Sequence, residues 1–205
     1  MYRKLRSHPL LIPLLALPLL LAGCSSDDID HYADTTPVLD IGEYFDGRTR
    51  AWGMVQDYRG EVQRRFVVDI DGEHDGTTLV LDEHFIYDDG ETDRRVWTFE
   101  RQDNGRWIGN ANDVEGPVEA RQAGHAFNMT YRLPVEVSGR EITFTMDDWM
   151  FLQPDDRLIN RTDMKKFGIT LARITLVFER VDTGSDDGDS EDIESQDTNA
   201  DASDT

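Results

Sequence analysis

The sequence predicts an all-β fold, an up-and-down antiparallel β-barrel of roughly eight to ten strands. Apolar and polar residues alternate over repeated short runs between residues 48 and 181, which is typical of strands with one buried face. Turn dipeptides such as Asn104-Gly105 separate these runs at about the spacing found in β-sandwiches and barrels. No long run has the 3.6-residue period of a helix. A single open sheet of this size would expose its apolar face, so closure into a barrel is favoured.

The first half of the predicted barrel consists of regular strands joined by short turns. In the second run, Phe66, Val68 and Ile70 share one face, and in the fourth run Trp97 and Phe99 do so. Such alternation places one face of each strand toward the core. Strands are therefore expected at residues 48–56, 61–71, 77–87, 93–101 and 106–110.

The second half is less uniform. Residues 114–124 contain Gly116-Pro117 and many small side chains, so we expect at most an edge strand there. Residues 157–167 fit a helix or a strand equally well. Clear alternation predicts further strands at residues 125–135, 140–152 and 168–181.

Asp147-Asp148 interrupts the apolar face of the 140–152 run, and two interpretations remain open. In the first, the strand is regular and Asp148 points inward, where it would need a cationic partner. In the second, a β-bulge at these two residues turns Trp149 and Phe151 inward instead. We favour the bulge slightly, and Trp149 is therefore placed in the predicted lining.

The N-terminus has the order of parts found in a secretory signal. A basic segment at residues 3–6 precedes an apolar run at residues 10–21. This run is shorter than the about 20 residues that a membrane-spanning helix requires. We therefore expect residues 1–23 to be a signal peptide.

Leu21-Ala22-Gly23-Cys24 resembles the lipobox of bacterial lipoproteins, in which the signal is removed and the cysteine carries lipid. The resemblance implies lipidation of Cys24 and a membrane as partner through that anchor. Ser25 follows it in place of the aspartate that retains enteric lipoproteins at the inner membrane. We therefore expect the outer membrane, on its periplasmic side. The polar residues 24–37 are expected to form a flexible tether to a barrel domain at residues 38–181.

Acidic residues dominate the composition. The chain carries 42 Asp and Glu against 21 Lys and Arg, a net charge of −21. This balance argues against nucleic acid as a partner. Residues 182–205 contain ten acidic residues, no basic residue and one large aliphatic, so we expect a disordered tail. The sequence does not identify a particular protein partner.

Residues for catalysis are scarce. Cys24 is the only cysteine, and Ser138 is the only serine between residues 38 and 181. There is no nucleophile elbow, phosphate-binding loop or His-rich metal motif. We expect a protein that is not an enzyme and has no cofactor. An enzyme acting through Asp148, or through Glu83 with His84, is a weaker alternative.

Charged residues on otherwise apolar faces indicate where a ligand could bind. Arg64, Glu83 and Arg95 each share a face with aromatic or aliphatic neighbours. Inside a barrel they would have to pair or contact a polar ligand group, whereas at the barrel mouth they could lie in water. The predicted ligand-binding residues are Trp52, Arg64, Phe66, Glu83, Phe85, Arg95, Trp97, Phe99, Tyr131 and Trp149.

Short motifs along the predicted barrel are Tyr44-Phe45-Asp46-Gly47, Ala51-Trp52-Gly53, Asp147-Asp148-Trp149-Met150, Asn160-Arg161 and Lys166-Phe167-Gly168. Together they resemble an uncharacterised proteobacterial lipoprotein family, the domain of unknown function 3833. The resemblance covers about residues 38–181 together with the lipobox, and implies no particular activity. The segment from Phe45 to Trp52 is also similar to the start of lipocalins. Its tryptophan is too far from Gly47 for their Gly-x-Trp motif, so that likeness concerns architecture alone.

These observations predict a lipid-anchored, lipocalin-like envelope protein that binds a lipid or another hydrophobic small molecule. The alternative is a structural or interaction lipoprotein. In that case the protein's own aromatic side chains would fill the barrel, and its outer face would bind another protein.

Overall fold

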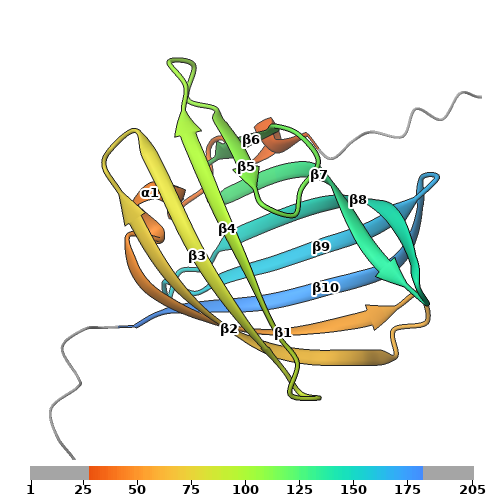
Figure 1. The fold of residues 1–205 in the computed structure, drawn as a ribbon. Coiled ribbons are helices and arrows are strands. Elements are labelled where there is room, and N and C mark those ends of the chain that lie inside the picture. Colours follow the sequence, from red (N-terminus) through yellow and green to blue (C-terminus); the bar gives the residue numbers. More distant parts are fainter. Residues whose placement is uncertain (1–27, 182–205) are drawn as a thin grey trace, which may run out of the picture.

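The computed structural model describes residues 28–181, whose fold is drawn in Figure 1. These residues form one closed antiparallel barrel with the strand order β1-β10-β9-β8-β7-β6-β5-β4-β3-β2. Each strand pairs with its neighbour in sequence, and β1 closes the sheet by pairing with β10. The predicted up-and-down β-barrel is thereby confirmed. The predicted signal peptide, Cys24 and the acidic tail at residues 182–205 lie outside the described residues.

Two short helices precede the strands. They are the 3-10 helix η1 (Ile29–Tyr32) and α1 (Ile41–Tyr44). No helix within residues 28–181 has the length and apolar character needed to cross a membrane. The strands are β1 (Gly47–Asp57), β2 (Val62–His74), β3 (Thr78–Tyr87), β4 (Thr92–Arg101), β5 (Trp107–Ala111), β6 (Val118–Ala123), β7 (Ala126–Val137), β8 (Arg140–Leu152), β9 (Leu158–Lys166) and β10 (Ile169–Arg180).

The ambiguous segment at residues 157–167 is strand β9. Leu158, Asn160 and Thr162 are buried, while Ile159 between them is 37% exposed on the outside. This alternation is that of a pleated strand. Pairing with β8 on one side and β10 on the other decides the conformation, because both neighbours need a hydrogen-bonded partner to close the barrel.

The weak run at residues 114–124 contains strand β6 only from Val118 onward. Gly116 has a φ of 73°, and Pro117 has no N–H to contribute to a ladder. Residues 112–117 therefore form a loop beside the short strands β5 and β6 (Figure 1). The Asn112 side chain accepts a hydrogen bond from the backbone N–H of Val96 in β4. The loop thus completes the wall where β5 is short.

Residues 38–45 close one end of the barrel, which we call the closed end. Leu39, Ile41, Tyr44 and Phe45 are buried there. Phe45 approaches β2 so closely that a Cβ at Gly72 would lie 1.7 Å from its carbonyl oxygen. The end opposite, formed by the β1–β2, β3–β4, β7–β8 and β9–β10 turns, is called the mouth.

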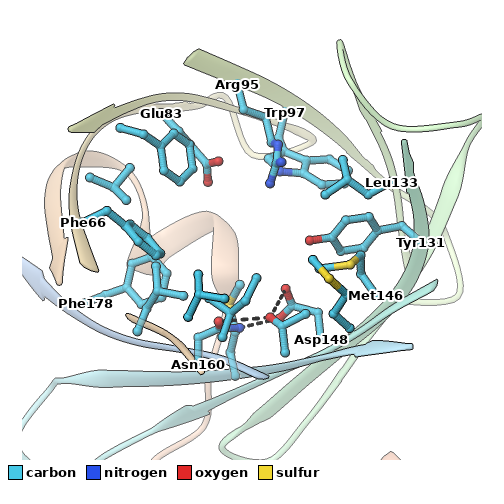
Figure 2. A pocket seen from close by; sticks show the side chains of 18 of the residues that line it. Phe66, Glu83, Arg95, Trp97, Tyr131, Leu133, Met146, Asp148, Asn160 and Phe178 are labelled. Atoms are coloured by element: carbon cyan, nitrogen blue, oxygen red, sulfur yellow. Dashed lines mark hydrogen bonds between the residues drawn. The ribbon is translucent and has the colours of Figure 1, made fainter. Parts of the chain in front are cut away.

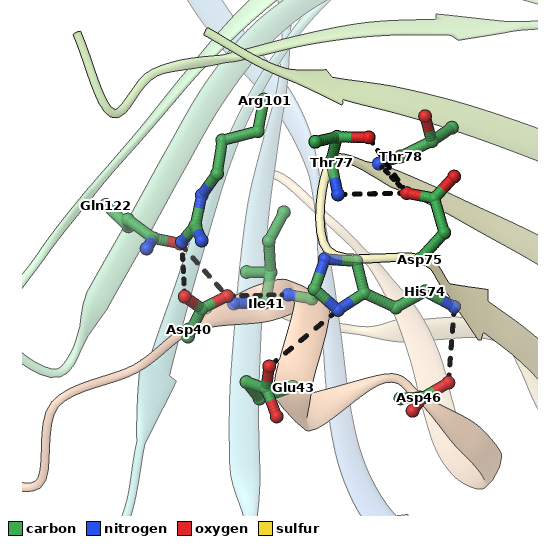
Figure 3. Close-up of polar contacts among 11 residues, drawn as sticks. Asp40, Ile41, Glu43, Asp46, His74, Asp75, Thr77, Thr78, Arg101 and Gln122 are labelled. Carbon is green, nitrogen blue, oxygen red and sulfur yellow. Dashed lines mark hydrogen bonds and ion pairs between the residues drawn. The ribbon is translucent and has the colours of Figure 1, made fainter. Parts of the chain in front are cut away.

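Polar contacts fix α1 at the closed end (Figure 3). Asp40 caps the helix by accepting a hydrogen bond from the N–H of Gly42 at 3.0 Å, and it also pairs with Arg101 of β4. The backbone N–H of His74 donates to Asp46 at 3.2 Å. Such caps satisfy N–H groups that a short helix leaves free, so the segment packs in one position.

The prediction of a flexible tether is wrong for residues 28–37. Ile29 is 2% exposed, and η1 packs against β6 and β7. Thr35 accepts a hydrogen bond from the N–H of His125, and the Tyr32 ring lies 5.5 Å from that of Phe151. The segment has too few apolar residues to show a hydrophobic period in the sequence. Those few pack against apolar side chains on the barrel surface.

The predicted β-bulge at Asp147-Asp148 is also wrong. Strand β8 pairs with β7 and β9 in unbroken register through both residues, with Asp148 opposite Met129 and Thr162. Because successive side chains alternate across a regular strand, Asp148 points into the barrel and Trp149 points out.

Candidate functional site

A cavity of about 280 Å³ lies inside the barrel. This volume is close to the lower limit, about 300 Å³, of pockets that hold small molecules. Figure 2 shows its polar side chains, Glu83, Arg95, Tyr131 and Asp148, directed inward from four different strands. The apolar wall consists of Val55, Phe66, Val68, Ile70, Phe85, Trp97, Met129, Leu133, Val135, Met146, Met150, Met164, Ile174, Leu176 and Phe178.

Most of the predicted ligand-binding residues lie at this cavity. Those that line it are Arg64, Phe66, Glu83, Phe85, Arg95, Trp97 and Tyr131. Phe99 lies deeper, where it borders a separate space of only about 30 Å³. The barrel is therefore filled toward the closed end and hollow in the middle. Whether the residues around the hollow part bind a ligand stays a prediction.

Trp52 does not line the cavity. It is 46% exposed on the outer surface and borders a groove of about 560 Å³ with Val67, Ile86 and Val177. The neighbouring Gly53 takes the inward position instead, and a Cβ there would lie 2.4 Å from the Phe66 ring. Phe66 of β2 thus occupies the space that a large residue of β1 would need.

Trp149 also lies outside the barrel. Its ring is stacked with that of Phe151 at a centroid distance of 5.9 Å, and Tyr32 packs edge-on against both. Its indole N–H donates to Asp147 at 3.1 Å. Trp149 therefore helps to hold η1 on the barrel, and its predicted place in the lining is corrected.

Asp148 is held by two neighbours on β9. Thr162 donates a hydrogen bond of 2.9 Å to one carboxyl oxygen, and the Asn160 amide donates to the other. All three residues are at most 5% exposed. Burial raises the pKa of Asp148 to about 6, and the two hydrogen bonds and the charge of Arg95 oppose part of that rise. Sequence reasoning missed Asn160 and Thr162 as site residues, although they share the face of Leu158.

Glu83 is directly opposite Arg95 in the register between β3 and β4. No hydrogen bond or ion pair to its carboxylate is present among residues 28–181. Burial raises the pKa of Glu83 to about 7, with Arg95 lowering it and Asp148 and Asp113 raising it further. The pKa of this carboxyl group therefore lies close to neutral pH.

Arg95 is bound by an acidic residue that the sequence did not indicate. Its Nε lies 2.9 Å from both carboxylate oxygens of Asp113, and its Nη2 lies 2.7 Å from one of them. Asp113 belongs to the loop at residues 112–117, so nothing in a strand pattern points to it. The guanidinium group is thereby neutralised from outside the cavity.

Arg64 lies nearer the mouth. It pairs with Asp89 at 3.0 Å and Glu91 at 2.5 Å in the β3–β4 turn. Its guanidinium carbon lies 3.5 Å from the centre of the Tyr87 ring, an arrangement that stabilises a cation on an aromatic face. Its Nε is buried and has no hydrogen-bond partner among the described residues.

The structure separates the two residues of one enzyme alternative, Glu83 and His84. His84 lies on the outside of β3, where it is 3.2 Å from Asp82, so it cannot act together with the inward Glu83. Residues 28–181 contain no group of three or more His, Cys, Asp or Glu side chains placed to hold a metal ion.

Comparison with known proteins gives one family. A family model described as Protein of unknown function (DUF3833) matches residues 18–180, which is most of the chain. A comparison with curated proteins found no match.

Proposed function

This chain belongs to the DUF3833 family of proteins of unknown function, and we propose that it is an envelope lipoprotein whose barrel binds a hydrophobic or amphipathic small molecule. The observation that carries this proposal is the hollow middle of the barrel, about 280 Å³ between apolar walls with a few inward polar groups. Ligand pockets generally combine these two features.

The energetics favour an occupant. Packed protein interiors have few voids larger than a water molecule. A cavity of this volume is therefore unusual, and a bound ligand would restore close packing. At roughly 30 Å³ per water-sized group, it holds roughly nine or ten heavy atoms. Each methylene group transferred from water into it contributes about 0.8 kcal/mol.

Native mass spectrometry of the purified full chain, after exposure to a bacterial lipid extract, tests the binding. We expect a retained small molecule of defined mass. Leu133→Trp narrows the cavity and should reduce retention, whereas Thr130→Trp places the same side chain on the exposed face of the same strand and should not. A chain that never retains a molecule would contradict the proposal.

The anchor rests on the lipobox-like sequence that ends in Cys24. Acyl chains on this cysteine would hold the protein on a membrane through chain burial. We expect Cys24→Ser to move the protein from the membrane fraction to the soluble fraction, while Ser26→Ala leaves it membrane-bound. Separation of inner and outer membranes then tests the proposed outer-membrane location.

A second candidate is binding of another envelope protein. It is favoured by the outer groove, where Trp52 and Ile86 are 46% and 50% exposed side by side with Val67 and Val177. Exposed aromatic side chains of this kind are enriched where proteins associate. Cross-linking in intact cells, compared between the native chain and Trp52→Ser, tests this role without any small molecule.

A further inference from the structure

The charges inside the cavity are unbalanced. Glu83 and Asp148 line it and are acidic, Asp113 lies just outside it, and Arg95 is the cation next to these three groups. Arg95 is already paired with Asp113, and Arg64 is paired with Asp89 and Glu91 at the mouth. The acidic groups that remain without a cation of their own are Glu83 and Asp148.

The carboxyl groups of Glu83 and Asp148 face the same space. Figure 2 shows Glu83 on one side of the cavity and Asp148 on the other, each directed toward the middle. Asp148 is held rigidly by Thr162 and Asn160, whereas Glu83 accepts no hydrogen bond from residues 28–181. A ligand between them would therefore meet acceptors more than donors.

The aromatic side chains of the cavity wall also favour a cation. Trp97 and Tyr131 meet edge to face at a centroid distance of 5.5 Å beside these carboxyl groups. Aromatic faces attract cations, and those of Phe85 and Tyr87 are already approached by Arg95 and Arg64. Trp97 and Tyr131 have no such contact with a cation among the described residues and line the cavity directly.

We infer that the polar end of the ligand is a protonated amine, and that Glu83 and Asp148 are the groups that receive it. This inference rests on the proposed binding function and specifies its ligand class, an apolar chain that ends in an ammonium group. A carboxylate end could reach Arg95 and the Tyr131 hydroxyl, but it would add another negative charge to a site that already has an excess of them.

The raised pKa values of the two carboxyl groups agree with this assignment. Burial disfavours their charged forms, and a cation placed between them would favour ionisation again. The groups that face Glu83 are Arg95 from β4, Asp148 from β8 and Asp113 from the loop, with Asp82 next to it in β3. Amine binding should thus release protons from the site near neutral pH.

The test compares octylamine, octan-1-ol and octanoate, three probes of matched size that fit the cavity volume. Isothermal titration of the full chain should give at least tenfold tighter binding of octylamine than of octanoate, with octanol between them. The measurement is made in about 0.5 M salt, because screening removes most of the attraction between the exposed acidic surface and any amine.

Variants separate the cavity from the surface. Glu83→Gln combined with Asp148→Asn should reduce the preference for octylamine to less than threefold. Glu100→Gln combined with Asp103→Asn removes the same number of negative charges from exposed positions and should leave the preference unchanged. A circular-dichroism melt of each variant verifies that the barrel is folded.

The outcomes also separate this inference from the proposed function. If octanoate binds as tightly as octylamine or more tightly, the amine assignment is wrong and small-molecule binding stands. A preference that survives in the cavity variant, or disappears in the surface variant, likewise overturns the assignment. If none of the three probes binds, the proposed function itself loses its support.

Discussion

Arg95 in β4 and Asp113 in the loop between β5 and β6 are joined by three contacts of 2.7–2.9 Å. The pair reaches from the cavity to the loop that completes the wall. It therefore connects a charged residue of the cavity to the loop that completes the barrel wall beside β5 and β6, the shortest strands.

Asp113→Asn should destabilise the barrel, because it leaves Arg95 without a charged partner while that side chain is only 18% exposed. For a partly exposed pair we expect a loss of about 1–2 kcal/mol in the free energy of unfolding, measured by urea denaturation. Asp82→Asn breaks the more exposed Arg94 pair and should cost less than about 1 kcal/mol. If the two variants lose the same free energy of unfolding, the Arg95–Asp113 pair contributes no more to the stability of the barrel than an exposed pair does.

Glu83→Gln should stabilise the protein relative to the native chain as the pH rises. The pKa of Glu83 is raised from 4.5 to about 7 in the folded state, so the stability that its protonated form contributes is present below pH 4.5. It is lost progressively as the pH rises through about 7. Between pH 5 and 8 the variant should gain on the order of 2–3 kcal/mol relative to the native chain. The free energy of unfolding of both proteins is measured by denaturation at pH 5 and at pH 8. If the difference between the variant and the native chain is the same at both pH values, the Glu83 carboxyl group is not buried.

Asn160→Leu removes a buried donor to Asp148 and should cost about 1–3 kcal/mol in the free energy of unfolding. The loss should be larger at pH 8 than at pH 5, because Asp148, with a pKa of about 6, is ionised at the higher value. Adding Asp148→Asn should recover part of the stability at pH 8. If the added change lowers stability at that pH, the carboxylate has another partner.

Gly53→Ala should destabilise the barrel and reduce the cavity. The new Cβ would lie 2.4 Å from the Phe66 ring, so the ring must move into the cavity that it lines. Overpacking of this kind typically costs about 1–3 kcal/mol, seen as a lower melting temperature. Phe66→Leu in the same chain should restore much of the loss by making room for the methyl group.

The period-two pattern predicts the inner face wherever a strand carries one uniform apolar side. This is why the pattern predicts inward faces for Phe66, Phe85, Trp97 and Tyr131, which line the cavity. For Glu83 and Arg95 the pattern leaves the interior and the mouth open, and both line the cavity in the structure. The pattern also favours closure, because a single open sheet of this length would expose its apolar face.

Trp52 and Trp149 were misplaced because side-chain size does not decide the face of a strand. In β1 the inward position belongs to Gly53, since Phe66 from the neighbouring strand already fills that space. In β8 unbroken register with β7 and β9 keeps Asp148 inward. Asp113 could not be predicted, because its role depends on a loop fold that no local pattern encodes. Residues 28–37 were misread for the same reason.

The seam between β1 and β10 joins residues from the two ends of the domain, with Thr49 opposite Arg180. Contacts so distant along the chain make folding slow, and this one cannot form before the last strand has been synthesised. Until then β1 has an unpaired edge on that side, which is a site for incorrect association. A growing chain therefore remains without its final closure through nearly the whole of its translation.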